Sequence, residues 1–188
     1  MTPQELLDKL GERRALLTGH FRLSSGLHSD RFIQKFRLFE DPTLAEEVGA
    51  TLAHLLSPYK PEVVVSAAVG GILPGYIVAK NLGVRNMFVE KENGIPTLRR
   101  GFELQLGERV AVVEDVMTTG KSTMEVIDVV RASGAQVSVV GTVVNRGKPS
   151  LPYPVITVLD LPLADYPPEA CPLCKQGVPL HDPGSRRS

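Results

Sequence analysis

Between residues 62 and 160 the chain alternates between short apolar runs, rich in β-branched residues, and segments with helical spacing. The runs are unbroken instead of alternating, which is typical of strands buried on both faces of a parallel sheet. Five runs have this pattern: "EVVVS" (62–66), "VRNMFVE" (84–90), "RVAVVED" (109–115), "QVSVVGTVV" (136–144) and "PVITVL" (154–159). Helices are expected in "ILPGYIVAKNLG" (72–83) and in "KSTMEVIDVVRASG" (121–134), where Gly134 ends the second. The pattern predicts a doubly wound α/β sheet with helices on both faces.

The first 60 residues have a different pattern. "TPQE" (2–5) has the spacing of a capping box, so a short helix opens the chain. "HFRLSSGLHSDRFIQKFRLF" (20–39) predicts two short strands around a Ser-Ser-Gly turn, which would form a small flap. A second helix is expected to begin with Asp41 as cap and Pro42 in its first turn. The apolar faces of these two helices would be Leu6, Leu7 and Leu10, and Leu44, Val48, Leu52, Leu55 and Leu56.

The length of 188 residues predicts one domain. We divide it into an N-terminal helix and flap segment (1–60), an α/β core (61–160) and a tail (161–188). The tail is rich in proline and glycine and is expected to be irregular.

Composition limits the classes of function. Hydrophobic residues make up 43% of the chain and charged residues 22%, as in globular proteins. Lysine plus arginine number 21 and equal aspartate plus glutamate, so no overall positive field favours nucleic acid. The N-terminus lacks the features of a signal peptide, and no run is long enough for a bilayer. We expect a cytoplasmic protein without nucleic-acid or membrane partners.

The stretch "VVEDVMTTGKST" (112–123) carries the strongest chemical signal. It ends like a nucleotide-binding Walker loop, yet Asp115 stands where that motif requires glycine. The "TTGKS" segment at a helix start suits a single phosphate group. Glu114 and Asp115 would then face sugar hydroxyls or a magnesium ion. The alternative is that the two acids are solvated at a strand end and that the segment is an ordinary turn.

This stretch resembles the phosphoribosyl-diphosphate (PRPP) loop of the type I phosphoribosyltransferases. The resemblance implies that fold, with a small N-terminal hood, and Mg²⁺ held through PRPP and water near the two acids. It also implies a catalytic role for Asp115. The residues implied to bind PRPP are Glu114, Asp115, Val116, Met117, Thr118, Thr119, Gly120, Lys121 and Ser122, with Gly70 and Gly71 at the diphosphate.

Other segments resemble the orotate-specific branch of this family: residues 21–42, 64–83, "NRG" at 145–147 and the C-terminal "CPLCKQGVPLHDPGSR". The resemblance implies transfer of the phosphoribosyl group from PRPP to orotate, giving orotidine 5′-monophosphate and diphosphate in pyrimidine biosynthesis. It also implies a homodimer. The residues implied to bind orotate are Thr118, Arg146, Phe32 and Ser25. Without the resemblance, Arg146 could be a surface arginine, Phe32 a core residue, and the two glycines part of a tight turn.

Residues 90–102, "EKENGIPTLRRGF", are polar and contain glycine, and they lie between two predicted strands. By resemblance they form a mobile lid whose Lys91, Arg99 and Arg100 stabilise the departing diphosphate. Taken alone, these three charges could simply be solvated. The chain also departs from the family, because many relatives carry lysine where it has Ser24 and Gly70. Which group assists diphosphate departure is therefore open.

Cys171 and Cys174 form a CxxC pair, which supplies half of a zinc site. His181 or the cysteines of a second copy could complete it, and the pair could instead be redox-active or inert. Two rival functions remain: a purine phosphoribosyltransferase, and a regulator that senses PRPP without catalysis.

Overall fold

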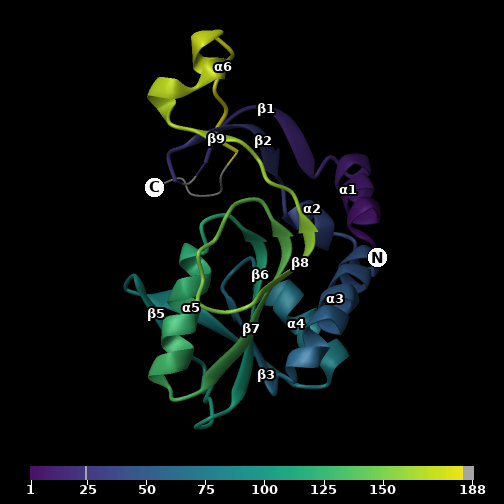
Figure 1. Ribbon diagram of the computed structural model, residues 1–188, viewed down its shortest axis with the longest axis vertical. Helices are drawn as coiled ribbons and strands as arrows, with labels where there is room; N and C mark the ends of the chain where they lie inside the picture. Colours follow the sequence, from purple (N-terminus) through teal and green to yellow (C-terminus); the bar gives the residue numbers. More distant parts are fainter. Residues whose placement is uncertain (24, 184–188) are drawn as a thin grey trace.

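A six-stranded sheet in the order β5-β4-β3-β6-β7-β8 forms the centre of the computed structural model, which describes residues 1–23 and 25–183 (Figure 1). All neighbouring strands are parallel except β5, which pairs antiparallel with β4. The strands are β3 (Val63–Ala67), β4 (Arg85–Glu92), β5 (Ile95–Leu98), β6 (Arg109–Met117), β7 (Gln136–Asn145) and β8 (Val155–Asp160). The five predicted apolar runs are confirmed as strands.

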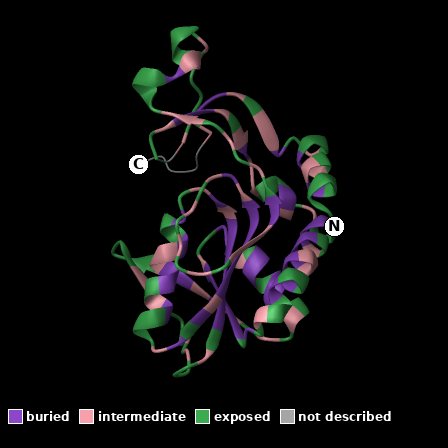
Figure 2. Ribbon diagram, viewed as in Figure 1, coloured by how far each residue is buried: buried purple, intermediate pink, exposed green. Residues whose placement is uncertain are grey.

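Two hydrophobic clusters pack on opposite faces of this sheet (Figure 2). Helices α3 (Pro42–Leu56) and α4 (Ile72–Leu82) cover one face, and α5 (Lys121–Ala132) covers the other (Figure 1). Val64 belongs to the first cluster and Val65 to the second, because successive side chains of a strand point to opposite faces. The predicted doubly wound α/β fold is confirmed.

The N-terminal elements follow the predicted signals closely. Helix α1 (Pro3–Glu12) has the complete capping box, in which the Glu5 amide donates to Thr2 Oγ1 and the Thr2 amide donates to the Glu5 carboxylate. Asp41 caps α3 through the amides of Thr43 and Leu44. One detail differs, because Leu55 is 38% exposed and does not belong to the buried face of α3.

The predicted flap is a hairpin of β1 (Leu16–Arg22) and β2 (His28–Ile33), followed by the short helix α2 (Phe36–Phe39). Ser24 lies outside the described residues. Short 3-10 turns occur at η1 (Ser57–Tyr59) and η2 (Pro168–Ala170).

The described part of the tail, which was expected to be irregular, contains short elements between its irregular stretches. Residues Asp165–Tyr166 form strand β9, which pairs antiparallel with β2, and Pro172–Lys175 form the short helix α6. The hairpin and β9 make a three-stranded sheet in the order β1-β2-β9, which we call the hood. Figure 1 shows the hood as a separate layer beyond the carboxyl ends of the parallel strands. Nothing in the tail's own sequence pattern announces β9, because two residues are too short to show an alternation.

Among the described residues, no helix is both long enough and apolar enough to cross a membrane.

Candidate active site

Glu114 and Asp115 lie within β6, near its carboxyl end, and not in the loop beyond the strand. β6 remains paired with β7 as far as Met117, which lies opposite Asn145, whereas its register with β3 ends at Val113. Glu114 is 8% exposed and Asp115 is 1% exposed. Burying a carboxylate costs desolvation free energy, so proteins bury carboxylates only where partners or a ligand compensate for that loss. The alternative of two solvated acids is therefore wrong.

Lys35 is a member of the site that the sequence did not single out. It follows β2, and its Nζ lies 2.7 Å from Asp115 Oδ2. A Cβ placed on Gly70 would lie 2.1 Å from the same carboxylate oxygen and 2.5 Å from Lys35 Nζ. Lys35 and Asp115 thus fill the space that a side chain at position 70 would need, so only glycine fits there. One feature of the sequence could have pointed to Lys35. Many relatives carry a lysine where this chain has Gly70, so another residue of this chain would have to supply that positive charge.

Burial raises the pKa of Glu114 to about 8, and the neighbouring Asp115 charge adds to this, while Lys35 opposes it. The pKa of glutamate in the unfolded chain is 4.5. Between these values the folded protein keeps a proton that the unfolded chain has lost, so the free energy of unfolding falls as pH rises. The loss is up to about 1.4 kcal/mol per pH unit. It is absent below pH 4.5 and complete above about pH 8.

Glu114→Gln should remove this dependence. We expect the melting temperature of the wild type to fall relative to that of the variant from pH 5 to pH 8, without ligands. Thermal unfolding across this range measures it. Glu90→Gln is the matched control, because hydrogen bonds from Arg100 lower the pKa of Glu90 and leave no such fall in this range. Parallel curves for wild type and Glu114→Gln would contradict the prediction.

The loop that follows β6 has the geometry of a phosphate cradle. Gly120 adopts φ +78°, which favours glycine, and as the N-cap residue of α5 it has no side chain that could occupy the amides of the first turn. The Lys121 amide donates to Thr119 Oγ1 at 3.3 Å. Thr119, Lys121 and Ser122 are exposed and Thr118 is half-buried, so the start of α5 is open to an anion.

Val116 and Met117, which the resemblance places among the PRPP contacts, have side chains in the two hydrophobic clusters. Met117 is 1% exposed. Met117 therefore offers a ligand only its backbone, whereas the side chain of Val116 is half-buried.

Two glycines allow the loops to approach closely. A Cβ on Gly147 would lie 2.1 Å from the carbonyl oxygen of Thr118, so the "NRG" segment lies directly against the phosphate loop. A Cβ on Gly71 would lie 2.8 Å from the carbonyl oxygen of Ala67. The Arg146 amide also donates to the Met117 carbonyl at 2.9 Å. Thr118 and Arg146, both predicted to contact the base, are thus brought together.

Arg146 is 5% exposed, which excludes the alternative of a surface arginine. Its Nη2 pairs with Asp165 of β9 and lies 3.5 Å from Ser29 Oγ of β2. Its Nε is one of six buried side-chain atoms in the described part of the chain that lack a hydrogen-bond partner. One edge of the guanidinium is therefore held by the hood, and a donor is left over. Asp165 was missed from the sequence because its contact depends on the unpredicted strand β9.

Phe32 and Ser25 are not brought to Arg146. The Phe32 ring lies 5.8 Å from that of Phe21 in the hood. Phe32 and Ser29 are three positions apart on β2, so their side chains point to opposite faces. Ser25 lies exposed in the hairpin turn, where its Oγ accepts from the Leu27 amide.

The predicted lid is a β-hairpin instead of an irregular loop. Asn93 (φ +51°) and Gly94 (φ +82°) form the tight turn between β4 and β5, which "NG" commonly encodes. The three basic side chains of the lid are all paired with acids other than Glu114 and Asp115. Lys91 pairs with Glu125 of α5 at 2.8 Å, Arg99 with Glu92 at 3.2 Å, and Arg100 with Glu90 through two hydrogen bonds of 2.9 Å.

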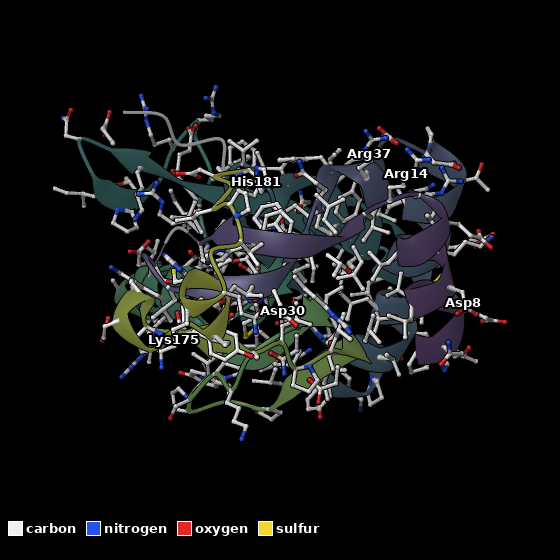
Figure 3. The ribbon with its side chains drawn as sticks, turned by 90° about the horizontal axis from the view of Figure 1, so that it is seen from above. Asp8, Arg14, Asp30, Arg37, Lys175 and His181 are labelled. Carbon is white, nitrogen blue, oxygen red and sulfur yellow. The ribbon has the colours of Figure 1, made fainter. Side chains whose placement is uncertain are left out.

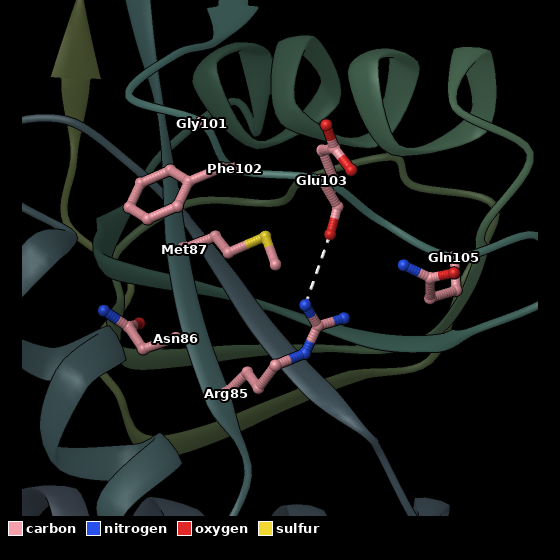
Figure 4. A pocket seen from close by; sticks show the side chains of 7 residues that line it. All are labelled: Arg85, Asn86, Met87, Gly101, Phe102, Glu103 and Gln105. Atoms are coloured by element: carbon pink, nitrogen blue, oxygen red, sulfur yellow. Dashed lines mark hydrogen bonds between the residues drawn. The ribbon is translucent and has the colours of Figure 1, made fainter.

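A surface pocket of about 510 Å³ lies at the base of this hairpin (Figure 4). Arg85 lines it and donates to the Glu103 carbonyl at 3.3 Å. Arg85 is in register with Val63, and Val63 with Val110, at the amino ends of the parallel strands. The pocket is therefore at the opposite end of the sheet from Asp115 and is not the candidate active site.

The two cysteines lie in the C-terminal segment beyond β9, next to the hood. Their sulfur atoms gather with ring nitrogens of His20 and His28. His181, considered from the sequence as a third ligand, is not a member of this group among the described residues. Its backbone pairs with His20 and Arg22 instead.

Comparison with known proteins places this geometry in a family. The family description "Phosphoribosyl transferase domain" matches residues 37–162. A Thermotoga maritima protein named orotate phosphoribosyltransferase is 50% identical over 185 residues, covering 97% of each chain. A protein of the same name from Caldanaerobacter subterraneus is 44% identical over 189 residues and all of both chains.

A solved structure agrees with the sequence relatives. The crystal structure of orotate phosphoribosyltransferase from Aeropyrum pernix superimposes with a TM-score of 0.71 and 27% identity, covering 83% of this chain and 93% of that one. The family match, the two relatives and the shared fold all agree. The chain belongs to the phosphoribosyltransferase family, in its orotate phosphoribosyltransferase branch.

Proposed function

We propose that this protein transfers the phosphoribosyl group of PRPP to orotate, giving orotidine 5′-monophosphate and diphosphate in pyrimidine biosynthesis. The observation that carries the proposal is a pair of buried acids followed directly by an exposed phosphate cradle. Glu114 is 8% and Asp115 1% exposed, and the cradle at Thr118–Ser122 opens onto the start of α5. A phosphate site beside two acids fits a sugar phosphate, whose hydroxyl groups the acids bind.

Each part of PRPP then has a place. The 5′-phosphate accepts from the backbone and hydroxyl groups of Thr118, Thr119, Gly120, Lys121 and Ser122, and the helix start favours its charge. Asp115 and Glu114 accept hydrogen bonds from the ribose diol. The diphosphate would lie at the backbone of Gly70 and Gly71, next to Lys35 Nζ, which fills the space beside Gly70 together with Asp115.

Lys35 supplies the positive charge that the chain lacks at Gly70. In the resting protein its Nζ neutralises Asp115 at 2.7 Å. When the ribose hydroxyls bind Asp115, Lys35 is free to pair with the diphosphate beside it. Negative charge develops on that group as the glycosidic bond breaks, so a fixed cation there stabilises the transition state.

Mg²⁺ fits this site. The two buried carboxylates and the phosphate oxygens of PRPP are hard oxygen donors, which Mg²⁺ prefers. The ion would be held mainly by PRPP and water near Glu114 and Asp115, and when bound it would neutralise charge on the diphosphate.

Orotate would lie between the phosphate loop and the hood. Arg146 would donate to its carboxylate, because a planar guanidinium matches a carboxylate and the Nε donor of Arg146 is unused. Thr118 would also contact the base, because it lies against Gly147, the residue that follows Arg146. Phe32 and Ser25 contribute only if the hood moves, since they face away or lie in the turn.

Lys91, Arg99 and Arg100 act at the diphosphate after the lid leaves its resting ion pairs. Pairs this exposed are worth about 0–1 kcal/mol each, so closure is not strongly opposed. Closure would exclude water from a reactive sugar cation. The protein would form a homodimer, in which this hairpin could act on the partner's site. It would work in the cytoplasm.

The proposal is tested by following the absorbance of orotate with PRPP and Mg²⁺, with adenine, hypoxanthine and uracil as parallel bases. We expect turnover of orotate alone, because only orotate presents a carboxylate to Arg146. Turnover of a purine instead would establish the rival purine activity. Binding of PRPP with no base consumed would favour the sensing regulator.

A further inference from the structure

Four metal-binding side chains from opposite ends of the chain meet in the hood. His20 lies on β1, His28 on β2, and Cys171 and Cys174 flank the start of α6. One ligand atom from each lies within 4.8 Å of every other. We propose that these residues bind one structural Zn²⁺ that joins the C-terminal segment to the hood hairpin.

Four of the six distances between ligand atoms are close to those of a tetrahedral site, and the other two are within 4.8 Å. With Zn–S of about 2.3 Å and Zn–N of about 2.0 Å, tetrahedral geometry requires S···N distances of about 3.5 Å and an N···N distance of about 3.3 Å. His20 Nε2 lies 3.5 Å from Cys171 Sγ and 3.7 Å from Cys174 Sγ. His28 Nδ1 lies 3.3 Å from Cys174 Sγ and 3.1 Å from His20 Nε2.

The ring of His20 is already oriented for a metal. Its Nδ1 lies 2.8 Å from the Val178 carbonyl oxygen, an acceptor, so Nδ1 carries the proton and donates it. Nε2 then presents a lone pair to the cluster. A ligating histidine that donates its other nitrogen to a backbone carbonyl is the usual outer contact of zinc sites.

The segment around the cysteines has no apolar core of its own, although backbone hydrogen bonds hold its two ends to the hood. Neither η2 nor α6 contains a buried residue, while Cys171 between them is 0% exposed. Figure 3 shows this part of the tail, near Lys175 and His181, lying over one end of the β1–β2 hairpin. A segment without its own apolar core needs another source of folding energy, and a metal ion supplies it.

Zn²⁺ is the ion that these donors select. Two thiolates and two imidazoles in a tetrahedron are a common structural zinc set. All four positions are taken by protein atoms, so no position is left for substrate or water. The site is therefore structural and not catalytic.

The test is metal analysis of the full-length protein purified without chelator. We expect about one zinc per chain, and less than about a tenth of that in Cys174→Ala and His28→Gln. His54→Gln and His181→Gln are matched controls that should keep the metal, since they are the chain's other two histidines and lie outside the cluster.

Replacement of zinc by Co²⁺ gives a second measurement that does not depend on a variant that folds. The wild type should show the strong visible bands of tetrahedral cobalt and a thiolate charge-transfer band. Chelation should increase tryptic cleavage after the exposed Lys175 by about tenfold, because α6 is released. A chain that contains no zinc and gives no tetrahedral cobalt spectrum, or one with a Cys171–Cys174 disulfide in its place, would overturn the proposal.

Discussion

Lys35→Met is expected to lower kcat for orotate turnover by about 100-fold, which is the usual effect of removing one charge-stabilising donor from a transition state. Lys35 Nζ lies 2.7 Å from Asp115 and would lie 2.5 Å from a Cβ on Gly70, so it is next to the proposed position of the departing diphosphate. Because the charge matters most when the bond breaks, kcat should fall more than the affinity for PRPP. Steady-state kinetics with varied PRPP separates the two.

Two further variants sharpen this experiment. Lys35→Arg keeps a positive charge and should retain part of the activity. Lys80→Met is the matched control, because Lys80 is an exposed lysine of α4 that pairs with Glu46 at 3.0 Å, away from the site. If Lys35→Met turns over orotate at the rate of Lys80→Met, Lys35 serves only to neutralise Asp115 in the resting protein.

Arg146→Ala is expected to lower kcat/KM for orotate by about 1,000-fold, since truncating one partner of a buried charge pair costs about 2–5 kcal/mol. PRPP binding, measured by calorimetry, should change little, because the phosphate loop and the acids remain. The substitution also leaves the half-buried carboxylate of Asp165 without its arginine, which should destabilise the hood.

The double variant Arg146→Ala with Asp165→Asn separates these effects. It removes the unpaired charge and should restore the melting temperature, while orotate turnover stays lost. Arg109→Ala, at the amino end of β6 where the side chain is exposed, is the control. Recovery of turnover in the double variant would show that Arg146 supports the hood and does not read orotate.

The sheet could be predicted from the sequence because its signals are local. Each buried parallel strand is an unbroken apolar run, and each is found where the pattern places it, such as Val63–Ala67. The same holds for helix starts, since the capping box of Thr2 and Glu5 lies within four residues. The candidate phosphate loop could be singled out for the same reason, because the acids, the glycine and the start of α5 are contiguous in the sequence.

What the sequence could not decide depends on residues that are far apart in the chain. Lys35 and Asp115 are 80 positions apart, and Arg146 meets Asp165 only because β9 pairs with β2. The CxxC pair showed two ligands, whereas its proposed partners, His20 and His28, come from the other end of the chain. Long-range contacts of this kind leave no periodic pattern in the sequence, so only the tertiary structure brings them together.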